Sequence, residues 1–173
     1  LSMSAFVVGL LLIGFMGYTT DFGKRALNTR FFERAILAEI EKKPKNPKLH
    51  NALASIYYQR GAFAQAVAAY QTVIRLAPQN VEALNNLAWL YATSEDEAYR
   101  DTQQAVDLAR KAAELKPTPH ILDTLAESYY ANGQFQKAVQ VIEKAVAKGP
   151  AEEAYYRRQM ERFKTAAQRN GAG

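Results

Sequence analysis

The stretch LASIYYQRGAF at residues 53–63 recurs as LAESYYANGQF at residues 125–135, so Leu-Ala-x-x-Tyr-Tyr-x-x-Gly-x-Phe occurs twice with every spacing kept. A partial copy, LAWLY, occupies residues 87–91, and its Leu and Tyr lie 34 residues after those of the first copy. The prolines that close these two copies, Pro78 and Pro117, lie 39 apart. The chain is therefore built from a repeated unit, and the middle unit holds about five extra residues.

Each unit predicts two amphipathic helices joined by a tight turn, because apolar residues recur three or four apart and no strand-like alternation is found. Gly61 and Gly133 lie where such a turn needs a residue that tolerates a positive φ. Pro78, Pro117 and Pro150 end the second helices, since proline lacks an amide donor and restricts the residue before it. Small residues are expected where the two helices of each unit cross: Ala66, Ala105 and Ala138.

These features together resemble the tetratricopeptide repeat family, with its small residue after Leu, its Tyr, its mid-repeat Ala and its closing Pro. The resemblance covers Pro47 to about Glu152. It implies an all-α fold, a right-handed α-solenoid of helix-turn-helix repeats. The sequence departs from the family pattern where His50, Leu84 and Leu122 take its early Trp position, and in the acidic insert at residues 93–101, which we expect to be a surface loop.

The expected domain organisation follows from these repeats and from the segments around them. A helix over residues 22–43, with one apolar stripe, is expected to cover the first repeat, and a helix over residues 154–167 to shield the last apolar face. The predicted domains are a membrane anchor (1–21), a linker or N-terminal capping helix (22–46), three repeats (47–80, 81–118 and 119–152) and a C-terminal capping helix with its tail (153–173).

Residues 1–20, LSMSAFVVGLLLIGFMGYTT, contain no charged side chain. Twenty helical residues rise about 30 Å, the thickness of the hydrocarbon core of a bilayer. This predicts one transmembrane helix; a signal peptide, which should have a basic leader and a small-x-small cleavage site, and a buried core helix are the alternatives. Small residues that would let another membrane helix approach closely are Ala5, Gly9, Gly14 and Gly17.

Basic residues follow this segment closely, at Lys24, Arg25, Arg30 and Arg34. The positive-inside rule then places the repeats in the cytoplasm. The chain does not start with Met, and a basic leader before Leu1 would place them in the periplasm instead. We expect a single-pass protein of a bacterial inner membrane.

The composition excludes several classes of chemistry. There is no cysteine, which rules out disulfides, thiolate metal sites and cysteine nucleophiles. The net charge is +5, but no nucleic-acid recognition motif accompanies it, so we expect solvated basic faces and no nucleic-acid partner. His50 and His120 have no carboxylate at ligand spacing, and the insert lacks the glycine and alternating oxygens of a calcium loop. We expect no enzyme, no cofactor and no metal.

What remains is a binding surface. In the family, first helices line a concave groove that holds a peptide or a partner helix. Trp89 is the leading candidate for a contact residue, because Leu84, Leu87, Ala88 and Tyr91 already fill the core faces of its helix; its alternative role is packing between repeats. By position, the groove is expected to show Asn51, Ser55, Tyr58, Gln59, Asn85, Trp89, Thr93, Asp123, Glu127 and Tyr130.

The expected ligand is neutral or partly basic and contacts aromatic side chains. Family members that grip a C-terminal carboxylate use Lys and Asn at set groove positions, of which only Asn86 fits here. We therefore expect a protein–protein adaptor or accessory subunit, with a protein partner in the groove and integral membrane subunits packed on the N-terminal helix. The alternatives are a self-associating scaffold, hence a homo-oligomer, and a regulatory part of a larger membrane protein.

Overall fold

The computed structural model describes residues 22–148 and 153–171, with side chains for residues 30–148 and 154–170. These residues form α-helices, one 3₁₀ turn and their connections, without a strand. The helices are α2 (Phe22–Lys42), α3 (Pro47–Gln59), α4 (Phe63–Leu76), α5 (Val81–Thr93), the 3₁₀ helix η2 (Glu97–Tyr99), α6 (Thr102–Leu115), α7 (Pro119–Ala131), α8 (Phe135–Lys148) and α9 (Glu153–Gly171).

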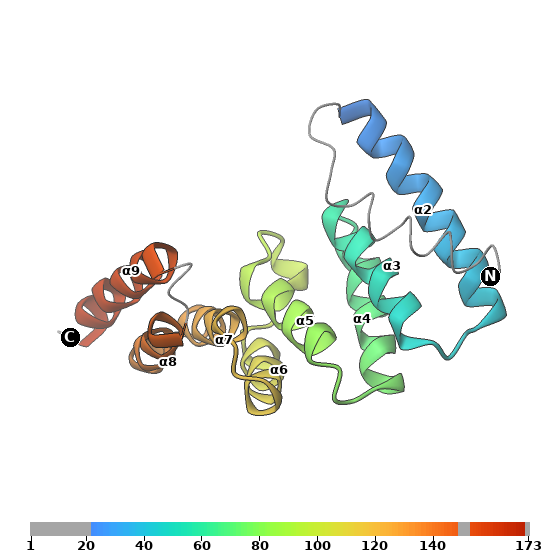
Figure 1. Ribbon diagram of the computed structural model, residues 1–173. Coiled ribbons are helices and arrows are strands. Elements are labelled where there is room, and N and C mark those ends of the chain that lie inside the picture. Colours follow the sequence, from blue (N-terminus) through green and yellow to red (C-terminus); the bar gives the residue numbers. More distant parts are fainter. Residues whose placement is uncertain (1–21, 149–152, 172–173) are drawn as a thin grey trace.

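The helices stack in chain order from α2 at one end to α9 at the other (Figure 1). α3 packs on α4, α5 on α6 and α7 on α8, which makes three helical hairpins. This confirms the predicted all-α repeat array. No described helix is long and apolar enough to cross a membrane, and the predicted anchor at residues 1–21, with Ala5, Gly9, Gly14 and Gly17, lies outside the described residues.

Two of the hairpin turns are built in the same way around a glycine. Gly61 has a φ of 71° and Gly133 a φ of 73°, the left-handed region that glycine adopts without a steric penalty. After α3, the amide of Ala62 donates to the carbonyl of Tyr57 at 2.9 Å, and the amide of Gly61 to that of Tyr58 at 3.0 Å. This Schellman pattern satisfies carbonyls that the end of the helix leaves free.

Polar side chains cap the N-termini of α3, α5 and α6. Asn46 accepts from the amide of Lys48, with Pro47 in the first turn of α3. Asn80 caps α5 in the same way at 2.9 Å, and Asp101 caps α6 at 2.9 Å. Such caps satisfy amides at the helix start that have no partner within the helix.

Alanines fill the crossings of the hairpin helices, as predicted. Ala66, Ala105 and Ala138 are fully buried, with no exposed surface. Each belongs to an apolar cluster with other fully buried alanines. Ala138, for example, shares its cluster with Ala126 and Ala145. Their small size lets the helix axes approach closely, so these positions fix the spacing of the hairpins.

The insert of the second hairpin is a surface loop whose aromatic side chain packs inward. Residues 95–98 are exposed, and Arg100 donates twice to the carbonyl of Ser94, at 2.8 and 3.1 Å. Tyr99 instead packs on Phe63 at the start of α4, with ring centroids 6.0 Å apart. The insert therefore ties the second hairpin to the first.

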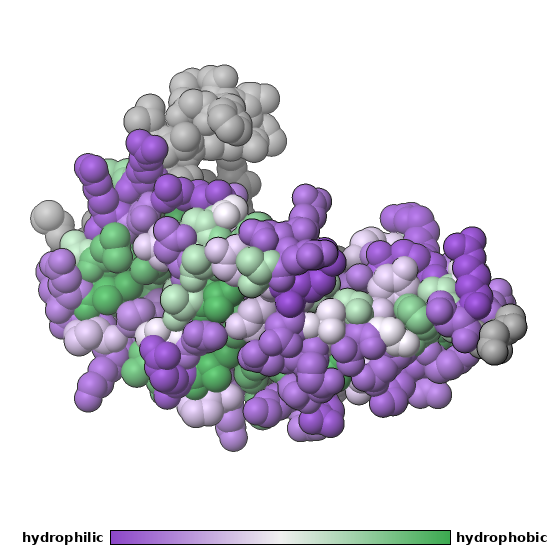
Figure 2. Space-filling model, turned by 180° about the vertical axis from the view of Figure 1, so that it is seen from behind, coloured by the Kyte–Doolittle hydropathy of each residue, from purple (hydrophilic) through white to green (hydrophobic). Residues whose placement is uncertain are grey.

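The face seen in Figure 2 is hydrophilic over most of the array, and more of its hydrophobic side chains lie toward the end that carries α2 than toward the other end. On α2, Phe31 is 66% exposed and Leu37 39% exposed. Arg60, at the end of α3, forms an ion pair with Glu33 of α2. This pair helps to hold α2 against the first hairpin.

Candidate functional site

A polar stripe runs along α5 on the side that the core leaves free. Seven residues of this helix are buried, among them Leu84, Leu87 and Tyr91. The remaining side chains lie three or four positions apart, which is the spacing of one helix face. That face carries Glu82, Asn85, Asn86, Trp89 and Thr93.

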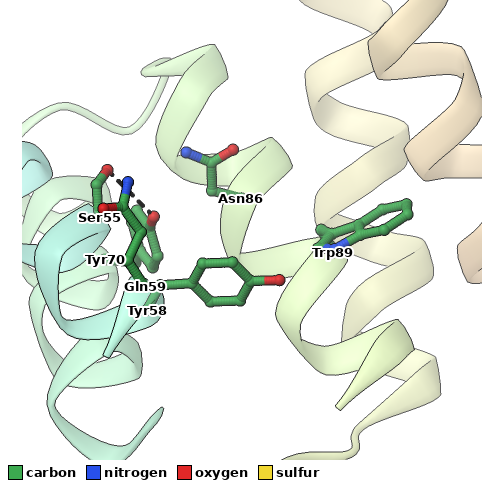
Figure 3. Close-up of a pocket in the computed structure, with 6 residues that line it drawn as sticks. All are labelled: Ser55, Tyr58, Gln59, Tyr70, Asn86 and Trp89. Atoms are coloured by element: carbon green, nitrogen blue, oxygen red, sulfur yellow. Dashed lines mark hydrogen bonds between the residues drawn. The ribbon is translucent and has the colours of Figure 1, made fainter. Parts of the chain in front are cut away.

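A pocket of about 190 Å³ opens between α3 and α5. α5 packs directly on α7, whereas α3 and α5 make few contacts, and the pocket occupies the space between them. The ring of Tyr58 extends from α3 across this space toward Trp89 of α5 (Figure 3). The pocket is lined by Ser55, Tyr58, Gln59, Tyr70, Asn86 and Trp89.

The floor of the pocket is held by hydrogen bonds to Tyr70 and Ser55. The Ser55 hydroxyl donates to the carbonyl of Asn51 at 3.1 Å and lies 3.5 Å from the Tyr70 hydroxyl, which is thus the donor of that second bond. Burial raises the pKa of the Tyr70 phenol above its ordinary value, so the group stays protonated at neutral pH. The lining is uncharged, and most of its polar groups can accept hydrogen bonds.

Two amide oxygens beside the pocket have no partner among the described residues. The Asn51 side chain donates to Glu82 at 3.2 Å and that of Asn85 donates to Asn86 at 3.4 Å. The Oδ1 atoms of Asn51 and Asn85 are buried and accept no hydrogen bond from the described residues. A buried acceptor without a donor costs about 1–3 kcal/mol of folding free energy.

The first helix of the third hairpin is α7. It differs from α3 and α5, the first helices of the other two hairpins, because α9 covers its groove face. Residues 121–128 are all buried. Tyr155 of α9 donates to Asp123 at 3.1 Å, and Arg162 of α9 forms an ion pair with Glu127. The sequence-based prediction of Asp123 and Glu127 as open groove residues therefore needs correction: they are 7% and 8% exposed, and α9 occupies the surface on which they lie.

Burial also changes the chemistry of Glu127. Its removal from water raises the pKa of the carboxyl above the ordinary value of 4.5, and this effect outweighs the opposing attraction of Arg162. Tyr130, one turn further along α7, is half-buried beneath the same arginine, whose guanidinium carbon lies 4.6 Å from the ring centroid. Tyr130 also stacks on Phe163 of α9 at 5.0 Å.

The structure thus brings together part of the expected groove. Tyr58, Gln59, Ser55 and Trp89 line one pocket, and Asn51 and Asn85 flank it. Thr93 donates to the Trp89 carbonyl at 2.7 Å and does not line the pocket. Asp123, Glu127 and Tyr130 lie apart, under α9.

Sequence reasoning missed Tyr70 and Glu82 as parts of this region, and it considered Asn86 only for carboxylate binding. Asn86 lies four residues after Glu82 and three before Trp89, so helical spacing already placed it on their face. Tyr70 comes from a second helix, and only the packing of α4 beneath α3 brings it to the pocket. The described residues contain no group of His, Asp or Glu side chains that could hold a metal ion.

Two family models match the chain over these repeats. The model described as TPR repeat matches residues 54–94, and the model described as Tetratricopeptide repeat matches residues 119–161. The chain belongs to the tetratricopeptide repeat family. Its repeats make it a scaffold for protein–protein interaction, since such solenoids present extended concave binding surfaces.

Solved structures with the same fold include proteins called MamA. One, "Crystal structure of MamA", is 16% identical with a TM-score of 0.60 and covers 90% of this chain and 100% of its own. A second, "Crystal structure of MamA protein", is 18% identical with a TM-score of 0.61, covering 86% and 85%. "MamA AMB-1 P212121" is 22% identical with a TM-score of 0.55, covering 70% and 73%. At these identities the likeness concerns the fold. No curated protein sequence matches the chain.

Proposed function

We propose that this tetratricopeptide repeat protein is a non-catalytic adaptor that holds a segment of a protein partner in the groove between α3 and α5. The observation that carries the proposal is the pocket that Tyr58 of α3 and Trp89 of α5 share. Asn51 and Asn85 adjoin its lining, since Asn51 bonds to Ser55 and Asn85 bonds to Asn86. The open groove is short, because α9 covers the corresponding face of α7.

The side-chain types in this groove suit peptide recognition. Aromatic residues in partly desolvated pockets supply most of the free energy at protein interfaces, and Trp and Tyr are enriched among such hot spots. Amide side chains offer both a donor and an acceptor, as a peptide backbone requires.

The test is partner capture by the full chain in mild detergent. Trp89→Ala and Tyr58→Ala should each weaken binding about 30-fold, which corresponds to roughly 2 kcal/mol at a hot spot. Leu115→Ala, which removes a 44% exposed apolar side chain that does not line the pocket, is the matched control and should bind normally. If the two pocket variants keep their helix content and still capture the partner like the parent chain, recognition lies elsewhere and the proposal is wrong.

We further propose that residues 1–20 anchor this adaptor in a membrane, so that the groove acts on a membrane-associated complex. Support comes from the sequence alone, a run of twenty residues without a charge. The intact chain should then stay in the membrane fraction through an alkaline carbonate wash. Its release into the wash would refute a spanning helix and leave the groove proposal untouched.

A further inference from the structure

The chain repeats one arrangement at a distance of 72 residues. α7 (Pro119–Ala131) corresponds in this way to α3, α8 to α4, and α9 begins 72 residues after α5. Tyr58 and Tyr130 are therefore equivalent. Their surroundings agree, since Tyr58 packs on Phe63 with centroids 6.0 Å apart and Tyr130 packs on Phe135 at 5.5 Å.

The two copies differ in what lies on the tyrosine ring. At Tyr130 the guanidinium of Arg162 lies over the ring at 4.6 Å and forms an ion pair with Glu127. At Tyr58 the described residues place no arginine or lysine over the ring, and the pocket occupies this region instead. The neighbouring cation Arg60 is engaged by Glu33 of α2.

We infer that the pocket between α3 and α5 binds an arginine side chain of the protein partner, whose guanidinium takes over Tyr58 the place that Arg162 takes over Tyr130. This inference rests on the proposed function and names the chemistry of its ligand. The tyrosine face attracts a cation. The oxygens of Ser55, Gln59 and Asn86 are acceptors for the five N–H groups of a guanidinium.

Other side chains fit this pocket less well. No Arg, Lys or His lines it, so a carboxylate would find no countercharge. An apolar side chain would displace water from the polar groups of the lining without offering them hydrogen bonds. Lysine presents a compact, strongly hydrated charge, whereas the planar guanidinium stacks on a ring and bonds in its plane at the same time. The pocket volume of about 190 Å³ suits a single side chain.

Trp89 makes the experiment direct, because it is the only tryptophan of the chain and lines the pocket. The full chain in mild detergent is titrated with acetyl-Gly-Arg-Gly-amide while the Trp89 emission is recorded. Matched peptides carry citrulline, which keeps the shape and loses the charge, or lysine. We expect a saturable change with the arginine peptide and an affinity about tenfold lower for each of the other two.

Two variants test the geometry. Tyr58→Leu should weaken binding of the arginine peptide about threefold to tenfold, because it removes the ring face. Ser55 is the equivalent of Glu127, so Ser55→Glu should tighten binding about tenfold through a charge-assisted bond, and only for the charged peptides. Tyr57→Leu makes the same change as Tyr58→Leu at a neighbouring residue outside the pocket and should leave binding unchanged.

The outcomes separate this inference from the proposed function. Equal binding of arginine and citrulline peptides would overturn it, as would an unchanged Trp89 emission in both the parent chain and a folded Ser55→Glu variant. If partner capture still depends on Trp89 and Tyr58 in those cases, the groove binds its partner without an arginine and the proposed function stands. If capture is also independent of both residues, both proposals fail.

Discussion

Replacing Ala138 by leucine tests the packing of the third hairpin. Ala138 has no exposed surface and lies in a cluster with Ile142, Tyr156 and Phe163, which are themselves buried. Leucine adds three carbon atoms at a point where α7, α8 and α9 meet. These atoms can enter only if the helices move apart or a neighbouring side chain leaves its preferred rotamer.

The expected cost is about 1–3 kcal/mol, the usual penalty for overpacking a well-filled core. In a chain of this size each kcal/mol lowers the melting temperature by roughly 2–4 °C, so Ala138→Leu should lower it by roughly 2–12 °C. Thermal unfolding followed by circular dichroism measures this shift. Urea unfolding of the same samples gives the free energy of unfolding independently.

Ala147→Leu is the matched control, since Ala147 lies in the same helix and is exposed. Alanine and leucine are both good helix formers, so helix propensity contributes little to the difference. If Ala138→Leu melts like the parent chain, or if Ala147→Leu costs as much, Ala138 does not lie at a close crossing of α7 and α8.

Three further substitutions follow from the structure. Burial raises the pKa of Glu127, so the folded state favours the protonated carboxyl. The stability that this group contributes is therefore lost as the pH rises from 4.5 through the raised pKa. Glu127→Gln should remove that pH dependence, as measured by urea unfolding midpoints between about pH 4 and 8. Gly133→Ala meets no atom within 4 Å but keeps a φ of +73°, so it should cost about 1–2 kcal/mol from backbone strain alone, and a neutral result in urea unfolding would contradict that cause. Tyr99→Ala should weaken peptide or partner binding at the pocket without large unfolding, since Tyr99 supports Phe63 and Phe63 supports Tyr58; unchanged binding would show that the insert does not position Tyr58.

The repeat fold could be predicted from the sequence because its determinants are local. A turn that requires positive φ selects Gly61 and Gly133, and a close helix crossing selects Ala66, Ala105 and Ala138. Each determinant acts within one hairpin, so the spacing of residue types carries the information.

The groove could be predicted only in part, because its limits depend on contacts between distant segments. The sequence of α7 alone predicted that its groove face is open. In the structure α9 covers this face, and Arg162 of α9, 35 residues after Glu127, forms an ion pair with it. The insert was expected to be an acidic surface loop, and its one aromatic residue, Tyr99, turns inward onto Phe63. An aromatic side chain in an acidic loop was a signal for this contact.

The burial of α7 also sets how the molecule opens. α7 packs against α5, α6 and α8, and side chains of α9 bond to its Asp123 and Glu127. The backbone amides of residues 121–128 should therefore exchange with deuterium only when the array unfolds as a whole. α2 makes substantial contacts only with α3. The amides of α2 and α3, at this end of the array, should therefore exchange first. The pocket lies on the boundary between these regimes, because α3 belongs to the labile end and α5 to the protected centre. A bound partner segment would join them, and slower amide exchange in α3 would report its arrival.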